Sequence, residues 1–252
     1  MLKVKLIAST PEPEKLVAAA ARFCYSPADY DSIMDGLTDE KAENYIDMLV
    51  EMGHESPVEH ASFTFAIEGV SRSLLAQITR HRIASFSVQS QRYVMENHFT
   101  YVTPPEIEDD PEAKAFFVRT MDEIQQSYDK LSDILYNKHL AVLGGPEIKG
   151  NKTKARKMAN EDARFVLPNA CETKIMMTMN ARSLYNFFSL RCCNRAQWEI
   201  RALAWEMLKI CREAAPALFK KAGPPCLYGP CTQGKMSCGR IEEVRKRGRM
   251  DV

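Results

Sequence analysis

Three consecutive basic residues, Arg80, His81 and Arg82, have side chains that could bind an anion. Arg92 follows, and a guanidinium group suits a phosphate because two parallel N–H donors match two of its oxygens. On one helix the three neighbours would point in three directions, whereas at a helix end or in a turn they could reach ligands on opposite sides. A solvated basic face is the alternative interpretation. The uncharged segment 83–90 reads as packed, and charges beside a packed segment need partners.

A second polar cluster lies between positions 180 and 191. Asn180, Arg182, Asn186 and Arg191 stand there among apolar and aromatic residues. Amide and guanidinium groups can hydrogen-bond the edge of a planar heterocycle while aromatic side chains cover its faces. An amphipathic helix, with these polar groups in structural hydrogen bonds, is the alternative.

His54, Glu59 and His60 form a third cluster, but their spacing lacks the i, i+4 pattern of two helical metal ligands. Loop histidines in ordinary hydrogen bonds are therefore the expectation, and no metal is expected.

The segment after about position 222 contains glycines, prolines and three cysteines, followed by the basic run 245–249. These cysteines are spaced more widely than the paired cysteines of common zinc sites, so a metal module built on them is a weaker alternative. All eight cysteines of the chain are expected to be thiols. We interpret 223–252 as a solvated, partly mobile extension of a domain that spans 1–222. The cysteines of this extension are Cys226, Cys231 and Cys238.

Several separated motifs, in one order along the chain, resemble the flavin-dependent thymidylate synthases. The pattern Arg-His-Arg, seven residues, Ser occurs at 80–82 and Ser90, and Gln91-Arg92-Tyr93 follows it. The resemblance covers roughly residues 1–220. The other matching segments are 53–60, 164–168 and 180–191.

The resemblance implies the reductive methylation of dUMP to dTMP, with 5,10-methylenetetrahydrofolate as carbon donor, NADPH as reductant and bound FAD as redox carrier. Because the N-terminus lacks the apolar core of a signal peptide, we expect a cytoplasmic protein. The resemblance also implies a homotetramer of mixed α/β subunits, with each site shared between subunits. Carried over position by position, the dUMP contacts are Gln77, Arg80, Val88, Ser90, Gln91, Arg92, Arg164 and Arg191. The FAD contacts are His54, Ser56, Arg80, His81, Arg82, Val88, Asn180, Arg182 and Asn186.

Arg191 is the residue expected to carry the chemistry. A fixed cation beside N3 of uracil and the neighbouring carbonyl would stabilise the ring as it becomes electron-rich at C5. The unrelated, flavin-free thymidylate synthases use a cysteine in a Pro-Cys-His setting, whereas Cys226 is followed here by Leu227. Ser90 has no adjacent base to activate it and is expected to position the substrate.

Two positions depart from the family pattern. Val88 stands where many relatives carry a polar residue that can touch both ligands, so contact there would come from the main chain. Arg195 stands where some relatives have a histidine near the flavin, which leaves its role open.

Hydrophobic periodicity predicts the elements that position these residues. Alternation indicates strands over 2–8, 61–67 and 171–179, and residues 26–37 read as a loop. A single α+β domain, with a small sheet flanked by long helices, is the expected fold. The predicted helices cover about 10–24 with Thr10 as N-cap, 38–52 with Thr38 as N-cap and Gly53 as stop, 71–80, 111–140, a stretch ending near 168, 180–191 and 196–220.

Composition bounds the remaining possibilities. The 252 residues are 45% hydrophobic and 27% charged, with a net charge of +1, which gives no bulk support to a nucleic-acid or membrane partner. No apolar run approaches the roughly 18–20 residues of a membrane span, and no signal-peptide core is visible. A non-catalytic nucleotide- or nucleic-acid-binding protein that uses the arginines and the basic tail is the competing function.

Overall fold

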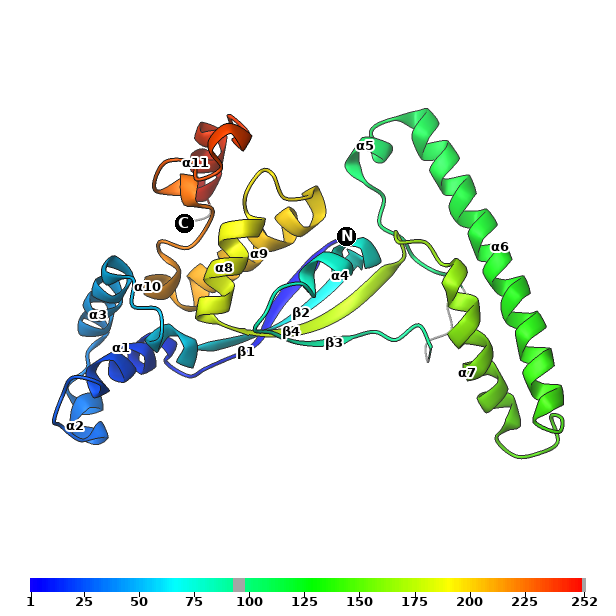
Figure 1. The fold of residues 1–252 in the computed structure, drawn as a ribbon, viewed down its shortest axis with the longest axis horizontal. Coiled ribbons are helices and arrows are strands. Elements are labelled where there is room, and N and C mark those ends of the chain that lie inside the picture. The colour runs from blue at the N-terminus through cyan, green and yellow to red at the C-terminus, as the bar shows by residue number, and fades with distance from the viewer. Residues whose placement is uncertain (93–97, 251–252) are drawn as a thin grey trace. The chain divides into compact units, whose positions relative to one another are not determined.

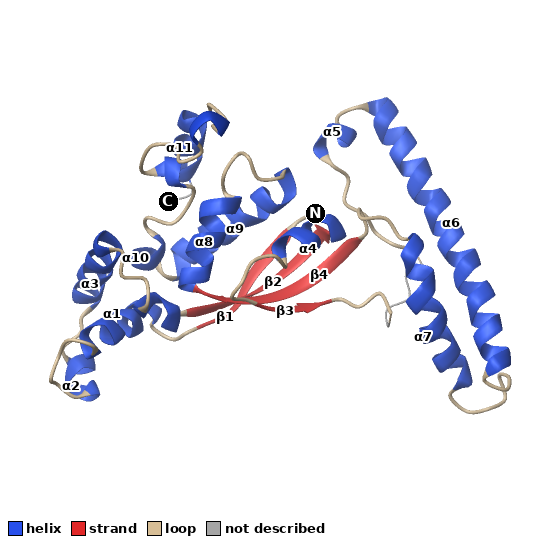
Figure 2. Cartoon of the chain, viewed as in Figure 1, coloured by secondary structure: helices blue, strands red, loops and turns tan. Residues whose placement is uncertain are grey.

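The computed structural model describes residues 1–92 and 98–250. Two compact units divide the chain. Unit 1 comprises Met1, Glu68–Leu75 and Val88–Lys174, and unit 2 comprises Leu2–Ile67, Ala76–Ser87 and Ile175–Val252. The mixed helix-and-sheet composition confirms the predicted α+β class (Figure 2).

The sheet has the strand order β1-β2-β4-β3 (Figure 1). Along β2 the burial alternates, with Phe63, Phe65 and Ile67 fully buried, as the sequence predicted for a strand with one face in the core. The hydroxyl groups of Thr64 and Thr178 lie 2.9 Å apart and couple β2 to β4. The strands are β1 (Lys3–Ser9), β2 (Ser62–Ser71), β3 (Ser85–Val88) and β4 (Glu172–Asn180).

The helices of unit 2 begin with α1 (Pro13–Phe23), α2 (Tyr30–Asp35) and α3 (Asp39–Met52). The caps of α3 were predicted correctly, because the Thr38 hydroxyl accepts from the Lys41 amide and Gly53 takes a φ of 69°. The predicted cap of α1 was wrong. The helix begins only at Pro13, and the Thr10 hydroxyl instead accepts from the amide of Ser62, 2.9 Å away.

Helix α2 lies in the stretch that was predicted to be a loop. Asp29 caps it by accepting from the Ser32 amide at 2.9 Å. Its buried Ile33 packs with Ala18 and Ala19 of α1. A six-residue helix has too few turns to show a periodic hydrophobic pattern, so the sequence did not predict α2. So short a helix depends on tertiary packing for its stability.

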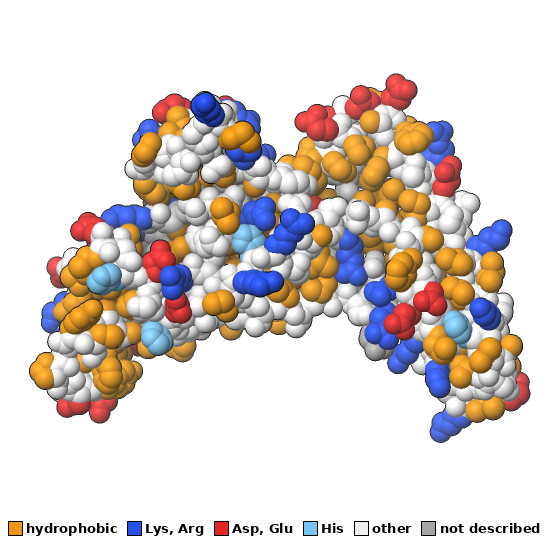
Figure 3. All heavy atoms as spheres, in the orientation of Figure 1, with side chains coloured by type: hydrophobic (Ala, Val, Ile, Leu, Met, Phe, Trp, Pro, Cys, Tyr) orange, Lys and Arg blue, Asp and Glu red, His pale blue; other side chains and the backbone are white. Residues whose placement is uncertain are grey.

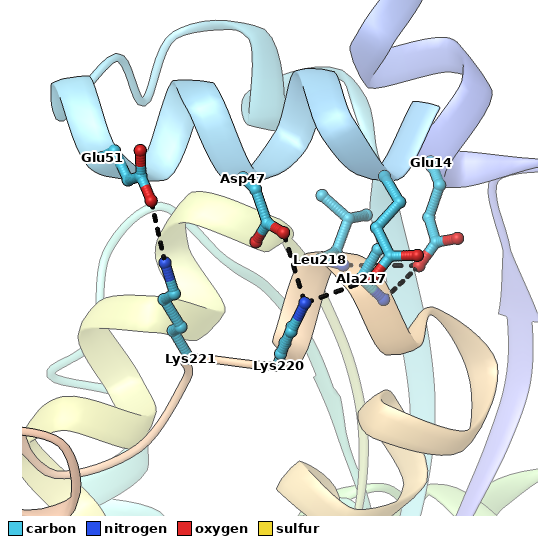
Figure 4. Close-up of polar contacts among 8 residues, drawn as sticks. Glu14, Asp47, Glu51, Ala217, Leu218, Lys220 and Lys221 are labelled. Atoms are coloured by element: carbon cyan, nitrogen blue, oxygen red, sulfur yellow. Dashed lines mark hydrogen bonds and ion pairs between the residues drawn. The ribbon is translucent and has the colours of Figure 1, made fainter. Parts of the chain in front are cut away.

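The remaining elements of unit 2 build the surroundings of the candidate site. Figure 4 shows how α3 is joined to the segment around α10: Lys220 pairs with Asp47 at 3.2 Å, and Lys221 approaches Glu51 at 3.8 Å. Glu14 of α1 accepts from the amide of Ala217 at the start of α10. The elements are η1 (Pro57–His60), α8 (Ala181–Arg191), α9 (Trp198–Ala214), α10 (Pro216–Phe219), η3 (Pro225–Leu227), η4 (Gly234–Met236) and α11 (Ile241–Met250).

Unit 1 is built on a long helix, α6 (Pro111–Val142), packed against α7 (Asn151–Ala163). The 32 residues of α6 span roughly 48 Å at 1.5 Å per residue. Arg156 of α7 donates both to the Ser132 hydroxyl and to the Asp133 carboxylate of α6. The short elements are α5 (Pro105–Glu108) and η2 (Arg164–Val166), and α4 (Arg72–Ile78) is divided between the units.

The C-terminal segment is packed, which corrects the prediction of a solvated tail. Cys226, Leu227 and Val244 are buried. The guanidinium of Arg212 in α9 donates to the Gly248 carbonyl of α11 at 3.1 Å. Hydrophobic periodicity within the segment does not indicate this packing, because its partners lie in α9 and in the loop after α10. Whether 223–252 is a separate extension stays a prediction.

Acidic and basic side chains are interspersed over the face shown in Figure 3, in keeping with the net charge of +1. In the described parts of the chain, 1–92 and 98–250, no helix has both the length and the apolar character that a bilayer span requires.

Candidate functional site

Helix α8 positions the four polar residues of the second cluster. Leu184, Phe187 and Phe188 are fully buried on its inner face, so the polar residues occupy the rest of the helix surface. Asn180 is its N-cap and accepts from the Ser183 amide at 2.9 Å. The alternative of an amphipathic helix with polar groups in structural hydrogen bonds therefore holds for Asn180. Binding of a planar heterocycle by this cluster stays a prediction.

A pocket of about 570 Å³ lies within unit 2, beside α8. Three of the predicted FAD-binding residues, His54, Arg182 and Asn186, line it, together with Lys221 and Tyr185. Its size is in the range of roughly 300–1,000 Å³ that small-molecule and cofactor sites occupy. The structure thus brings residues from two distant sequence clusters to one cavity.

Arg182 is held by two carboxylates at this pocket. Its Nε donates to Glu55 at 3.1 Å, and its Nη1 contacts Glu59. These hydrogen bonds, first that of Glu59 and then that of Glu55, raise the pKa of Arg182. All three side chains are partly exposed, so the ion pairs are weak enough to be exchanged for those of a ligand. Ser56, which was also predicted to contact FAD, lies between Glu55 and Glu59 in the sequence and is exposed.

The Arg80-His81-Arg82 motif leaves α4 in a turn. The Arg80 amide donates to the Gln77 carbonyl and the His81 amide to the Ile78 carbonyl. Arg80 and Arg82 are exposed whereas His81 is buried. Whether these side chains reach two ligands on opposite sides stays a prediction. The partly buried Gln77 lies in the last turn of α4.

His81 contacts Arg191, the residue predicted to carry the chemistry. The Nε of Arg191 donates to Nε2 of His81 at 2.8 Å. The imidazole is 7% exposed and packs edge-on against Phe187, with 4.9 Å between the ring centroids. Burial, and then the charge of Arg191, lower the pKa of His81 from 6.5 to about 4. Burial and the nearby charge of Arg80 lower the pKa of Arg191.

A neutral, buried His81 should make the fold less stable as the pH falls. Between pH 6.5 and about 4 the unfolded chain binds a proton at this position that the native chain does not. Unfolding should therefore become easier, by roughly 3 kcal/mol over that window. Urea titrations between pH 7 and 4 measure this slope. In His81→Gln the dependence of the unfolding free energy on pH should be smaller by the contribution of His81. An unchanged dependence would contradict the lowered pKa of His81.

In unit 1, three of the predicted dUMP-binding residues lie close together. Nη2 of Arg92 pairs with the Glu161 carboxylate at 3.1 Å, and Nε of Arg164 donates to the Glu161 carbonyl at 3.1 Å. The Ser90 hydroxyl accepts from the Arg92 amide. Glu161 was not identified from the sequence. What could have indicated it is its acidic side chain, three positions before Arg164, after a largely basic stretch of α7.

Gln91 is buried, and its side chain already has protein partners. Arg72 donates to its Oε1 at 2.8 Å, and its Nε2 contacts the sulfur of Cys171 at 3.4 Å. A contact between this residue and dUMP would therefore come from the main chain. Val88 ends β3 and is partly buried. Tyr93 of the motif lies outside the described residues.

The expectation that segment 83–90 is packed was wrong. Ile83 is 74% exposed, and the side chains of β3 are exposed or partly buried. Strand β3 is the last in the sheet order, so it pairs through β4 alone. An uncharged sequence does not distinguish such an edge strand from a buried one.

Two of the three late cysteines share a small cavity with Cys193, which follows α8. Cys193, Cys226 and Cys231 line a cavity of about 80 Å³. All eight cysteines are free thiols, as predicted. Within the described residues, no three His, Cys, Asp or Glu side chains are arranged to hold a metal ion. Arg195, whose role was open, donates to the Gln233 side chain at 3.3 Å.

Comparison with known proteins places the chain in a family. Residues 5–217 match the family model described as thymidylate synthase complementing protein. The flavin-dependent thymidylate synthase of Clostridium tetani is 53% identical over 97% of this chain and 96% of its own. That of Geobacter sulfurreducens is 45% identical over 97% of both chains.

A solved structure has a similar fold. It is the UMP/dUMP methylase PolB from Streptomyces cacaoi, bound with 5-Br dUMP, with a TM-score of 0.66 and 23% identity over 87% of this chain and 93% of that chain. At that identity the likeness concerns the fold. The sequence relatives, which extend over nearly the whole chain, and the family model over residues 5–217 show that this protein belongs to the flavin-dependent thymidylate synthase family.

Proposed function

We propose that the protein catalyses the reductive methylation of dUMP to dTMP, with 5,10-methylenetetrahydrofolate as carbon donor, NADPH as reductant and FAD as bound cofactor. Membership of the family supports the reaction. The pocket that His54, Arg182 and Asn186 line together is the observation that supports assigning this function to particular residues. These residues come from motifs more than a hundred positions apart, and chance would not bring them to one cavity of cofactor size.

The residues around this pocket fit a flavin dinucleotide. The N-terminus of α8, with Arg182 in its first turn, favours the negative charge of a pyrophosphate. Asn186 and His54 add hydrogen-bonding groups to the lining. When bound, FAD would supply the redox chemistry of the transfer. The other FAD contacts that we propose are Ser56, Arg80, His81, Arg82, Val88 and Asn180.

Arg92 and Arg164 are suited to the phosphate of dUMP. Both lie against Glu161, one on its side chain and one on its main chain, so two guanidinium groups are held in neighbouring positions. A dianionic phosphate could take the place of the Glu161 carboxylate on Arg92, because that ion pair is partly exposed. We also propose Gln77, Arg80, Val88, Ser90, Gln91 and Arg191 as dUMP contacts.

Arg191 would stabilise the uracil ring as its electron density rises at C5. No cysteine is needed as nucleophile in this scheme. Cys192, the nearest in sequence, is fully buried, and desolvation raises the pKa of the buried Cys211 thiol. We further propose a cytoplasmic homotetramer whose sites are shared between subunits, as the family resemblance implies.

The assay of the purified protein tests the function directly. The protein should be yellow, release FAD on denaturation, and form dTMP from dUMP only when the folate and NADPH are both present. Release of the C5 proton of dUMP should depend on FAD and on reductant. A colourless protein that FAD does not reconstitute, or one that forms no dTMP with all components, would overturn the proposal.

The competing nucleic-acid function has little support from the tail. Arg245 donates to the carbonyls of Cys226 and Gly229, and Arg247 stacks over Trp205 at 4.8 Å. These basic residues are thus used in packing. Salt-sensitive RNA binding that disappears on deletion of 240–249 would revive this function.

Arg182→Gln should weaken FAD binding about ten- to a hundredfold, because one charge-assisted contact to the cofactor is lost. FAD titration of the apoprotein, followed by flavin fluorescence, measures the affinity. Lys15→Gln is the matched control, since Lys15 also pairs with two carboxylates, Glu12 and Asp39, but lies outside this pocket. Equal losses in both variants would contradict a specific role of Arg182.

A further inference from the structure

Arg191 differs from Arg182 and Arg92 of the candidate site in the partner that holds it. Arg182 is held by Glu55 and Glu59, and Arg92 is held by Glu161. Arg191 instead donates to the imidazole of His81. The difference matters because a carboxylate offsets the charge of a guanidinium group, whereas a neutral imidazole orients it without offsetting that charge.

The geometry fixes the state of the imidazole. Nε2 of His81 can accept the hydrogen bond from Arg191 only if it carries no proton, so the proton of the neutral ring is on Nδ1. With a pKa of about 4, the ring is neutral at pH 7. The edge-on contact with Phe187 and the low exposure of the ring restrict its orientation. Arg191 therefore donates to an uncharged acceptor whose orientation is restricted.

The surroundings leave the charge of Arg191 available to a ligand. The hydrogen bond to His81 uses Nε, the inner nitrogen of the guanidinium, and not the terminal Nη1 and Nη2. Burial and the neighbouring cation Arg80 both disfavour the charged form of Arg191. A cation in such surroundings is stabilised when an anionic or electron-rich group arrives, which is typical of a functional site.

We propose that His81 is a positioning residue, which holds Arg191 through Nε while leaving the charge of the guanidinium undiminished for the uracil ring of dUMP. The proposal deepens, and rests on, the proposed reaction. It assigns the side chain of His81 a role through Arg191, so the FAD contact proposed for this residue would come from its main chain. The requirement is specific: the partner of Arg191 must be an acceptor and must also be neutral.

Three variants at this position separate the two requirements. His81→Gln keeps a neutral acceptor, His81→Glu has nearly the same shape but adds a negative charge, and His81→Leu has no acceptor. We expect kcat of the Gln variant to stay within about tenfold of wild type, and kcat of the Glu and Leu variants to fall about a hundredfold or more. FAD content should remain stoichiometric in the Gln and Leu variants. Equal activity of the Gln and Glu variants would overturn the charge requirement. Loss of FAD from the Leu variant would overturn the positioning role in favour of a direct contact between the His81 side chain and the flavin.

A double-mutant cycle tests whether the effect passes through Arg191. In an Arg191→Ala background, His81→Leu should cause little further loss of kcat, because the group that it positions is already absent. A full additional hundredfold loss would overturn the positioning role. Thermal unfolding of each variant identifies any that fail to fold.

Nitrogen NMR of the imidazole gives a readout that does not depend on catalysis. In the wild-type protein at pH 7, His81 should be neutral with its proton on Nδ1, and Arg191→Ala should shift the Nε2 resonance. A doubly protonated ring, or an Nε2-protonated one, would overturn the proposal even in an active enzyme. If the wild type forms no dTMP but shows the expected tautomer, the proposed function fails and the His81–Arg191 pairing does not.

Discussion

Arg191→Ala should lower kcat by at least about a hundredfold while FAD remains bound. The lost cation stabilises negative charge that develops on the uracil ring in the transition state, so its removal affects turnover more than binding. Arg191 lies at the end of α8 and outside the lining of the pocket that contains Arg182 and Asn186, so the flavin should lose few contacts. Binding of dUMP should weaken less than turnover. Steady-state kinetics, dUMP titration and flavin absorbance measure the three quantities separately.

Arg191→Lys is the informative control for this variant. Lysine keeps the charge but has neither the planar fork nor the Nε that donates to His81. We expect most of the loss in kcat to remain. A lysine variant with wild-type turnover would mean that charge alone suffices, and full activity of the alanine variant would refute the catalytic role of Arg191.

The second large effect should come from Arg92→Ala, which is expected to raise the KM for dUMP about ten- to a hundredfold with little change in kcat. A guanidinium contact to a phosphate is charge-assisted and worth about 1.5–3 kcal/mol, and it acts equally in the substrate complex and the transition state. Uniform binding of this kind appears in KM rather than in kcat. Initial rates over a range of dUMP concentrations resolve the two.

Glu161→Gln separates a phosphate contact from a structural ion pair. If Arg92 matters only because it pairs with Glu161, both variants should be equally impaired. If Arg92 binds phosphate, removal of the competing carboxylate should leave the KM unchanged or lower it. A rise in KM as large as that of Arg92→Ala would contradict the phosphate assignment.

The elements with strong local signals were predictable from the sequence. The alternation in β2 follows from the side-chain period of a strand, and Thr38 and Gly53 mark the ends of α3 through chemistry that is confined to a few residues. The long apolar pattern of α6 fixed that helix to within a few residues. In each of these cases the determining interaction is local.

The features that were missed depend on contacts between distant segments. Helix α2 is fixed by the packing of Ile33 on α1. Thr10 bonds to Ser62 across 52 positions and so does not cap α1. Within the site, the motifs identified His81 and Arg191 separately, but their hydrogen bond joins positions 110 residues apart. Similarly, nothing in the spacing of Glu161 indicated that it would hold Arg92.

The buried guanidinium of Arg212 connects the C-terminal segment to the pocket wall. Besides Gly248, it donates to the carbonyls of Phe219 and Ala222, and Ala222 lines the pocket. A side chain at position 248 would collide with Leu227, so the fit there is close. Local opening of α11 would remove the Gly248 carbonyl from the buried guanidinium of Arg212, and its hydrogen bonds to Phe219 and Ala222 would weaken. The C-terminal helix and the rim of the cavity should therefore open as one cooperative unit, with a shared free energy in amide hydrogen exchange.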